Sequence, residues 1–317
     1  MRSSIILTVA LFILIASTRT FAQYAQIDPR TLPAEIAAQE TIVASAASKD
    51  WQAWLKLAVL LEDAGSYRQS EDAYRQTIAL LRAPDPLTVA DVFDHMATMY
   101  IASGRPSEAE PIERHALAIR EYQHDKLGAG VSHMHMAMIL LGENALRPAQ
   151  AEAQTAVNLL VPEYGDHAGV SVATPEEKMN ALVDLSLIQS ASGASQTALA
   201  ALQGALRIAH ENYPDDSIPV GYIEFTLGQT LWKTGDATQG DILMDRGVQK
   251  LSSEISWSHP AYLGTLRQYK VFLLATKQQG KAQQIAAKIA TLEKLDHPLV
   301  SFAVASASAA NSHNLPK

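Results

Sequence analysis

The sequence contains no cysteine, few aromatic residues and no long apolar segment. Without cysteine the chain can form no disulfide and has no thiol for lipidation, so its stability must come from packing. The most apolar stretch, from Ile5 to Ile15, is far shorter than the roughly 20 residues that a helix needs to cross a bilayer. These absences predict a protein without stable membrane insertion once any leader has been removed.

Basic residues are also scarce, because 25 Lys and Arg face 33 Asp and Glu and give a formal net charge of −8. Nucleic-acid binding depends on cationic side chains that neutralise phosphates, so this balance argues against a nucleic-acid partner. Hydrophobic residues make up 48% of the chain, which excludes general disorder. The composition is that of a folded protein whose partners are not polyanions.

The segment from Met1 to Ala22 has the pattern of a secretory signal peptide. Arg2 precedes the apolar segment, and small residues lead to Thr20, Phe21 and Ala22, after which we expect cleavage before Gln23. The alternative is an apolar helix that stays in the fold, but this segment lacks the polar face of such a helix. We therefore expect an exported protein, located in a periplasm or outside the cell.

The segment from Asp91 to Arg120 is the clearest structural unit of the remaining chain. Gly104 and Pro106 separate two stretches with helical periodicity, because glycine closes helices and proline opens them. The apolar positions follow the spacing of one helix face on each side of this turn, at Phe93, Met96, Ala97 and Tyr100 and then at Ala109, Ile112, Ala116 and Ile119. The pattern predicts a tight antiparallel hairpin, with alanines where the two backbones approach each other.

Similar hairpins recur along the chain, which predicts an array in which neighbours cover each other. We expect a leading helix in residues 23–50, about six hairpins in residues 51–297 and a disordered tail in residues 298–317. Thr174 and Glu177 form the pattern of a capping box at one helix start. The expected turn markers lie about 40 to 50 residues apart, at Gly65, Gly104, Asn144, Gly193, Gly235 and Gly280.

These residues resemble tetratricopeptide repeats. Small residues stand at the eighth and twentieth positions of the units, and large apolar residues at the fourth and eleventh. The period of about 42 residues and linkers such as Tyr213-Pro214-Asp215-Asp216 are similar to the kinesin light chain type of repeat. The resemblance implies an all-α, right-handed superhelical solenoid of antiparallel helix hairpins that acts as a binding scaffold. It implies no catalytic residues.

The sequence shows no pattern of a catalytic, cofactor or metal site. HExxH, GxSxG, P-loop and GxGxxG motifs do not occur. His133 and His135 are two residues apart and point to different sides of a helix, while His95 and His135 lie about one helix spacing, or about 10 Å, apart. Neither pair can share a zinc ion, so we expect no metal, no cofactor and no enzymatic activity.

The first helix of each hairpin should line a concave groove, and its residues that do not pack are the candidate partner-binding site. Large apolar side chains at such positions favour binding of a protein or peptide. The alternative is that they pack against the next repeat. The candidates are Met134, Met138, Asn180, Tyr222, Phe225, Gln229, Trp232, Arg267, Lys270 and Lys277. The alternative function is that of a regulatory or accessory subunit of an envelope enzyme or secretion assembly.

Overall fold

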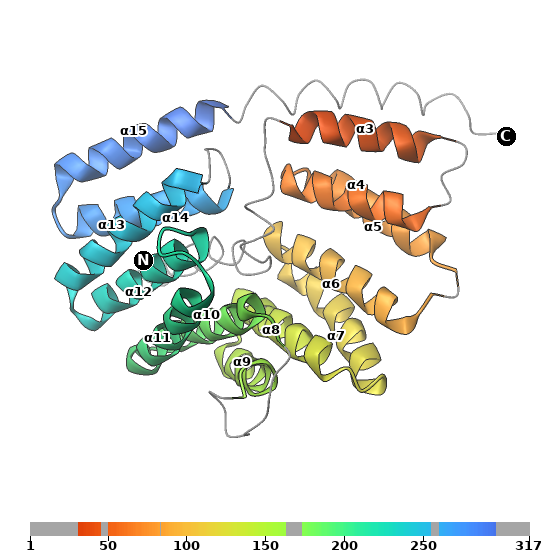
Figure 1. Ribbon diagram of the computed structural model, residues 1–317, viewed down its shortest axis with the longest axis horizontal. Helices are drawn as coiled ribbons and strands as arrows, with labels where there is room; N and C mark the ends of the chain where they lie inside the picture. The colour runs from red at the N-terminus through yellow and green to blue at the C-terminus, as the bar shows by residue number, and fades with distance from the viewer. Residues whose placement is uncertain (1–30, 46–49, 83, 163–172, 255–259, 296–317) are drawn as a thin grey trace. The chain divides into compact units, whose positions relative to one another are not determined.

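The structure is a computed structural model that describes residues 31–45, 50–82, 84–162, 173–254 and 260–295. Within these ranges every regular element is an α-helix, and there are thirteen of them (Figure 1). The first seven are α3 (Leu32–Ala44), α4 (Trp51–Asp63), α5 (Tyr67–Leu80), α6 (Pro86–Ala102), α7 (Pro106–Tyr122), α8 (Lys126–Gly142) and α9 (Leu146–Leu160). The others are α10 (Pro175–Ala191), α11 (Ser195–Asn212), α12 (Ile218–Thr234), α13 (Ala237–Glu254), α14 (Pro260–Ala275) and α15 (Gln279–Leu295).

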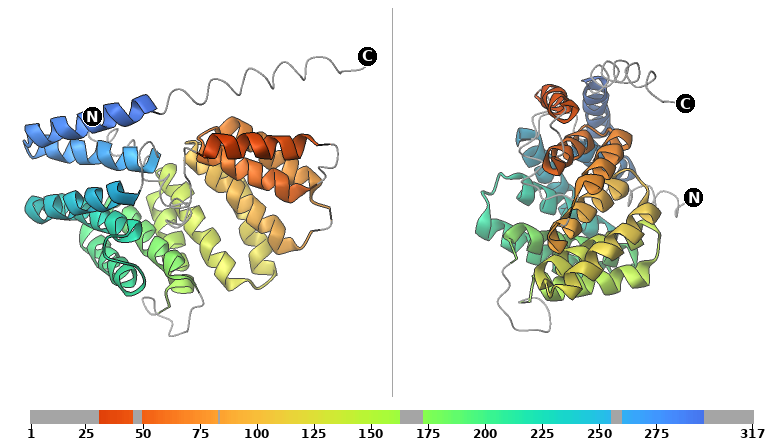
Figure 2. Two further views of the ribbon diagram at one scale, coloured as in Figure 1. Left: turned by 45° about the horizontal axis from the view of Figure 1, so that its top comes forward. Right: turned by 90° about the vertical axis from the view of Figure 1, so that its right-hand side faces the viewer.

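The helices fall into two compact units that divide between residues 254 and 255. In the first unit α3 precedes five helical hairpins, and each helix contacts the next one along the chain (Figures 1 and 2). In the second unit α14 pairs with α15. The predicted all-α solenoid of antiparallel hairpins is confirmed. The predicted leader in residues 1–22 and the tail in residues 298–317 lie outside the described residues.

None of the helices in the described ranges has the length and hydropathy of a membrane-spanning segment.

A recurring backbone turn closes seven of the described helices. In each turn one residue has a positive φ, and the N–H of the residue after it donates to a carbonyl five residues back, as from Ser66 to Leu61 at 2.8 Å. This is the bond of a Schellman motif, which satisfies a carbonyl that the helix end leaves open. The positive-φ residues are Gly65, Gly104, His124, Asn144, Gly193, Gly235 and Lys277.

Two expectations about these turns have different outcomes. Asn144 adopts a φ of 61°, so the prediction that asparagine replaces glycine there is confirmed. The expected turn at Gly280 is wrong, because Lys277 takes the left-handed conformation with φ of 62° and Gly280 lies inside α15. Gly280 therefore lies three residues after the residue that forms the turn.

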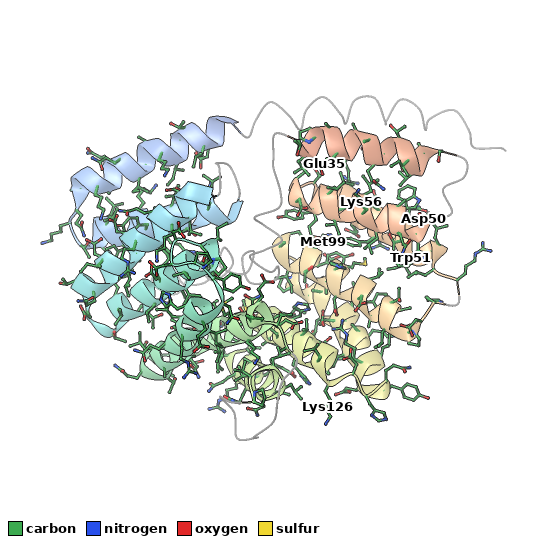
Figure 3. All side chains as sticks on the ribbon, viewed as in Figure 1. Glu35, Asp50, Trp51, Lys56, Met99 and Lys126 are labelled. Carbon is green, nitrogen blue, oxygen red and sulfur yellow. The ribbon has the colours of Figure 1, made fainter. Side chains whose placement is uncertain are left out.

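Polar side chains cap several helix starts. The predicted capping box at α10 is confirmed, since Glu177 N donates to Thr174 Oγ1 at 3.2 Å and Thr174 N donates to Glu177 Oε2 at 2.6 Å. At α4, Asp50 accepts a bond from the backbone N–H of Gln52 at 2.9 Å, and Trp51 begins the helix (Figure 3). These bonds satisfy N–H groups that a helix start leaves without partners.

Small residues allow the helices of a hairpin to approach closely. Ala97, Ala109 and Ala116 are completely buried between α6 and α7, as their spacing predicts. In the α12–α13 hairpin, a Cβ atom added to Gly228 would lie 2.7 Å from the carbonyl oxygen of Gly240. Such contacts leave no room for larger side chains. The sequence thereby fixes which faces of the two helices meet.

Candidate functional site

Most of the predicted groove residues in the first unit are buried. Their side chains retain at most 7% of their exposed surface, which excludes a large solvent-facing area at these positions. They are Met134, Met138, Asn180, Tyr222 and Phe225. The expectation that these side chains face solvent is wrong, because neighbouring helices cover them more closely than the repeat pattern implies. Their contact with a partner stays a prediction.

Gln229 and Trp232 are the predicted α12 residues that keep partial exposure. Phe225 is instead part of the contact between α12 and α13, since its Cβ would lie 2.8 Å from a Cβ added to Gly247. The predicted aromatic residues of α12 therefore differ in burial. Phe225 packs inside the hairpin, whereas Trp232 keeps part of its surface exposed.

In the second unit, one face of α14 is basic and apolar. Lys270 and Arg267 are half-exposed, and Val271 and Leu274 are exposed on the same helix. Their spacing places the four residues on one side, because residues three or four apart share a helix face. We call Arg267, Lys270, Val271 and Leu274 the α14 face.

Two of the three basic residues predicted to line the groove are less available to a partner than expected. Arg267 donates to Glu293 of α15 at 2.7 Å, so an internal partner offsets its charge. Lys277 does not lie on the helix, because α14 ends at Ala275 and Lys277 occupies the following turn. Lys270 is therefore the predicted basic residue that lies directly beside the exposed apolar pair.

A buried acid lies between α12 and α13. Glu224 is 1% exposed and forms ion pairs with Arg246 and, at 3.0 Å, with Lys250, both from α13. Two cations oppose this one carboxylate, which offsets the cost of burying its charge. We interpret the arrangement as an internal ion pair that holds the hairpin together.

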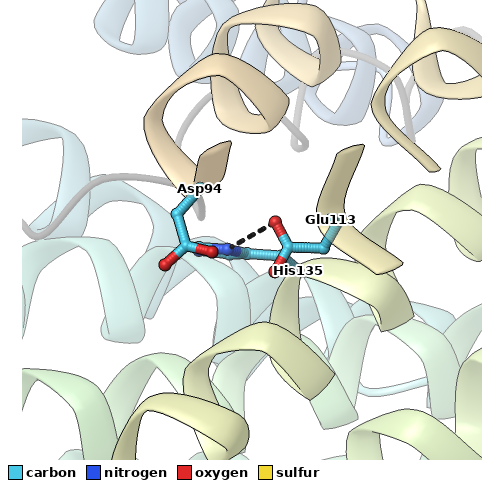
Figure 4. A group of neighbouring side chains, drawn as sticks. All are labelled: Asp94, Glu113 and His135. Carbon is cyan, nitrogen blue, oxygen red and sulfur yellow. Dashed lines mark hydrogen bonds and ion pairs between the residues drawn. The ribbon is translucent and has the colours of Figure 1, made fainter. Parts of the chain in front are cut away.

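A different buried cluster joins three helices of the first unit. Asp94 of α6, Glu113 of α7 and His135 of α8 point toward one another (Figure 4). His135 Nδ1 lies 3.3 Å from Glu113 Oε2, and one ligand atom from each residue falls within 4.8 Å of the other two. All three side chains are buried. Two acids and an imidazole in one enclosed place are uncommon in a helical core.

Arg120 provides a positive charge at the edge of this cluster. It forms an ion pair with Asp94 Oδ2 and contacts Asp91 Oδ1 at 2.9 Å. It also donates to the carbonyl of Gly128 at 2.9 Å and to Ser132 Oγ at 3.1 Å. Arg120 therefore occupies one oxygen of Asp94 and links the end of α7 to the start of α8.

Charge and burial shift the pKa values in the cluster. Burial raises the pKa of Asp94 well above its usual range, and the negative charge of Glu113 raises it further. Burial alone would lower the pKa of His135, but the opposite charges of Glu113 and Asp94 outweigh it and the net shift is upward. Both side chains therefore hold a proton more strongly than they would in water.

The sequence pattern did not identify this cluster. The separation of His133 from His135 is as expected, since His133 Nδ1 contacts Glu152 Oε2 at 2.5 Å while His135 contacts Glu113. Histidine spacing alone, however, does not reveal acids that a neighbouring helix contributes. The available signal was Glu113, an acid next to Ile112 on the expected inner side of α7.

Comparisons with known proteins support the repeat architecture. The family described as tetratricopeptide repeat matches residues 89–121, which cover most of α6 and α7. The search of curated proteins finds no match. Solved structures do resemble this chain, but their sequence identity to it is low, so they bear on its fold alone.

Three of these solved structures illustrate the similarity. Kinesin light chain nearly identical TPR-like repeats from Podosopora anserina are 15% identical, with a TM-score of 0.51, and the match covers 64% of this chain and 94% of that one. A Rap protein complexed with competence and sporulation factor is 11% identical, with a TM-score of 0.58, and the match covers 80% of this chain and 78% of that one. The APC/C heterotetramer Cut9-Hcn1 is 12% identical, with a TM-score of 0.58, and the match covers 84% of this chain and 45% of that one.

Proposed function

We propose that the protein is an exported, non-catalytic scaffold that binds a protein or peptide partner. The observation that carries this proposal is the α14 face, where Val271 and Leu274 are 43% and 47% exposed beside Lys270. Single exposed apolar residues are common, but two on one helix face next to a cation offer a hydrophobic contact together with a charged one. Tetratricopeptide-like architecture supplies the rigid support for such a surface.

The composition of the α14 face favours a partner segment with an apolar residue close to a carboxylate. The apolar residue would bury Val271 and Leu274, and the carboxylate would lie near Lys270. Desolvated apolar contacts dominate affinity in most interfaces, whereas an exposed lysine mainly affects the association rate and its salt dependence. The Rap protein, whose fold is similar, was crystallised in complex with competence and sporulation factor, which supports partner binding as a use of this fold.

Site-specific photocrosslinking in the native host tests the binding surface. A benzophenone amino acid at position 274 should crosslink one defined protein, identified by mass spectrometry. Position 242 is the matched control, because Ile242 is also 47% exposed but lies on α13. Leu274→Asp should then lower the affinity for that protein at least about tenfold, as expected for an interface centre. Equal crosslinking from both positions would contradict the assignment.

Export is tested separately. Expressed with its leader, the protein should be recovered from the periplasm or the medium with Gln23 as its first residue. Amino-terminal sequencing that finds Met1 on the protein in the cell envelope would overturn the proposed localisation, and it would leave the binding surface to be judged on the crosslinking result.

A further inference from the structure

The cluster of Asp94, Glu113 and His135 places two acids and an imidazole together in a buried site. Arg120 contacts Asp94 through Oδ2, and His135 contacts Glu113 through Oε2. The other oxygens, Asp94 Oδ1 and Glu113 Oε1, are buried and have no hydrogen-bond partner among the described residues. A buried carboxylate oxygen without a partner is costly, so a cation bound at these oxygens would be favourable.

We propose that Asp94, Glu113 and His135 bind one divalent transition-metal ion, with Zn²⁺ as the ion that fits best. One ligand atom from each residue already lies within 4.8 Å of the others. Ligands at about 2.0 to 2.2 Å from zinc are roughly 3 to 4 Å apart, so small side-chain rotations would bring the three atoms to the ion. Three protein ligands leave a coordination position for water.

The local charge favours a cation. Arg120 is the permanently charged cation that contacts the cluster, and the acids around it outnumber it. The acidic residues around it are Asp91, Asp94, Glu113 and Asp125. A divalent ion near Asp94 Oδ1 would offset this excess, while Arg120 keeps its contacts with Asp94 Oδ2 and Asp91. Metal binding would displace the protons that Asp94 and His135 hold, so the affinity should rise with pH.

The donor set selects the class of metal. An imidazole nitrogen favours borderline ions such as zinc, while Ca²⁺ and Mg²⁺ prefer sites made entirely of oxygen. The chain has no cysteine, so it provides no thiolate that would attract softer ions. The carboxylates add the negative charge that a divalent ion requires.

The position of the ligands in the fold gives the ion a structural role. Each ligand comes from a different helix, and α6 and α7 belong to one hairpin while α8 begins the next. A bound ion would therefore connect two successive repeats. Because the unfolded chain does not hold the three ligands together, binding would stabilise the folded state and raise the melting temperature.

The test uses the mature chain, freed of purification tags, treated with EDTA and then dialysed. Isothermal titration with ZnCl2 should show one equivalent bound per chain, and ZnCl2 should raise the melting temperature. His135→Asn should weaken binding at least about tenfold and abolish the thermal shift. The matched control is His133→Asn, which removes another histidine of α8, one that contacts Glu152 of α9, and it should leave both results unchanged.

A second variant keeps the test decisive if His135→Asn does not fold. Glu113→Gln retains the size of the side chain and removes its charge, and it should likewise lose the bound equivalent while circular dichroism remains helical. Three results would overturn the proposal. They are the absence of stoichiometric zinc in the wild-type protein, an equal loss in His133→Asn, or retention of zinc by both His135→Asn and Glu113→Gln.

Discussion

Gly247 of α13 lies so close to Gly221 of α12 that a Cβ atom added to Gly247 would come within 2.5 Å of the Gly221 carbonyl oxygen. The same added atom would lie 2.8 Å from Phe225 Cβ. Backbone cannot move aside as the end of a flexible side chain can, so any larger residue at position 247 must push the two helices apart. Glycine at this position is a packing requirement of the α12–α13 hairpin.

Gly247→Ala should therefore destabilise the protein, by about 1 to 3 kcal/mol, through overpacking. Gly280→Ala is the control, because a Cβ atom there meets nothing within 4 Å and the residue lies in α15 without a positive φ. Melting temperatures from circular dichroism compare the two variants with the wild type. An unchanged melting temperature for Gly247→Ala would mean that α12 and α13 can move apart with little loss of stability.

Ala116→Leu should destabilise the α6–α7 hairpin by a similar mechanism and amount, about 1 to 3 kcal/mol. Ala116 is completely buried, whereas Ala118 on the same helix is exposed. Ala118→Leu adds the same atoms in solvent and should change the free energy of unfolding by less than about 0.5 kcal/mol. Chemical denaturation measures both values, and equal effects would contradict the assigned helix face.

Glu71 should make the protein less stable in acid. Partial burial raises the pKa of Glu71, but hydrogen bonds from Arg105, Arg75 and Tyr100 outweigh burial and lower its pKa to about 2. Tyr100 Oη donates to Glu71 Oε1 at 3.0 Å and Arg105 donates to Glu71 Oε2 at 2.8 Å. The folded state therefore binds the proton less well than the unfolded state does. The stability that the charged Glu71 contributes is complete above about pH 5, and it is lost as the pH falls toward 2.

Glu71→Gln should reduce stability at pH 7 by about 1 to 2 kcal/mol, because solvent screens part of these interactions. Its unfolding free energy should also change less than that of the wild type between pH 5 and pH 2. Glu110→Gln is the control, since Glu110 contacts Arg114 within one helix. Parallel acid profiles for the wild type and Glu71→Gln would show that this network does not hold the carboxylate in its charged form.

Phe225→Ala should cost about 3 to 5 kcal/mol, as expected for a large side chain in a packed core. Phe225 is 2% exposed, whereas Trp232 keeps part of its surface exposed. Trp232→Ala should therefore have the smaller effect on the melting temperature. If Phe225→Ala leaves the melting temperature unchanged and weakens binding to the crosslinked partner, Phe225 acts as a surface anchor and its assignment to the core is wrong.

The fold was largely predictable because its main signals are local. Helical spacing around Ala97 and Ala116 identified the packed faces, and Thr174 with Glu177 identified a helix start. The turn expected at Gly280 shows the limit of this reasoning. Glycine permits a left-handed backbone but does not require it, and Lys277 adopts that conformation instead.

The candidate site was less predictable because it depends on how helices meet. Asp94, Glu113 and His135 stand on three different helices with a turn between each and the next, so no local spacing relates them. Burial of Phe225 likewise depends on Gly247, a residue of the next helix. Helical periodicity assigns each residue to a face, but it does not say how closely the neighbouring helix covers that face.

The recurring turn makes this chain suitable for distance measurements by fluorescence. Its closing bond involves main-chain atoms only, so glycine, histidine, asparagine and lysine all occupy the left-handed position. The sequence has no cysteine, so introduced thiols would be the only sites for a maleimide dye. Asn144→Cys and Lys277→Cys keep a side chain at positions that already hold one. A dye pair at these two turns, one in each compact unit, would report the separation of the units in solution and its change when a partner binds.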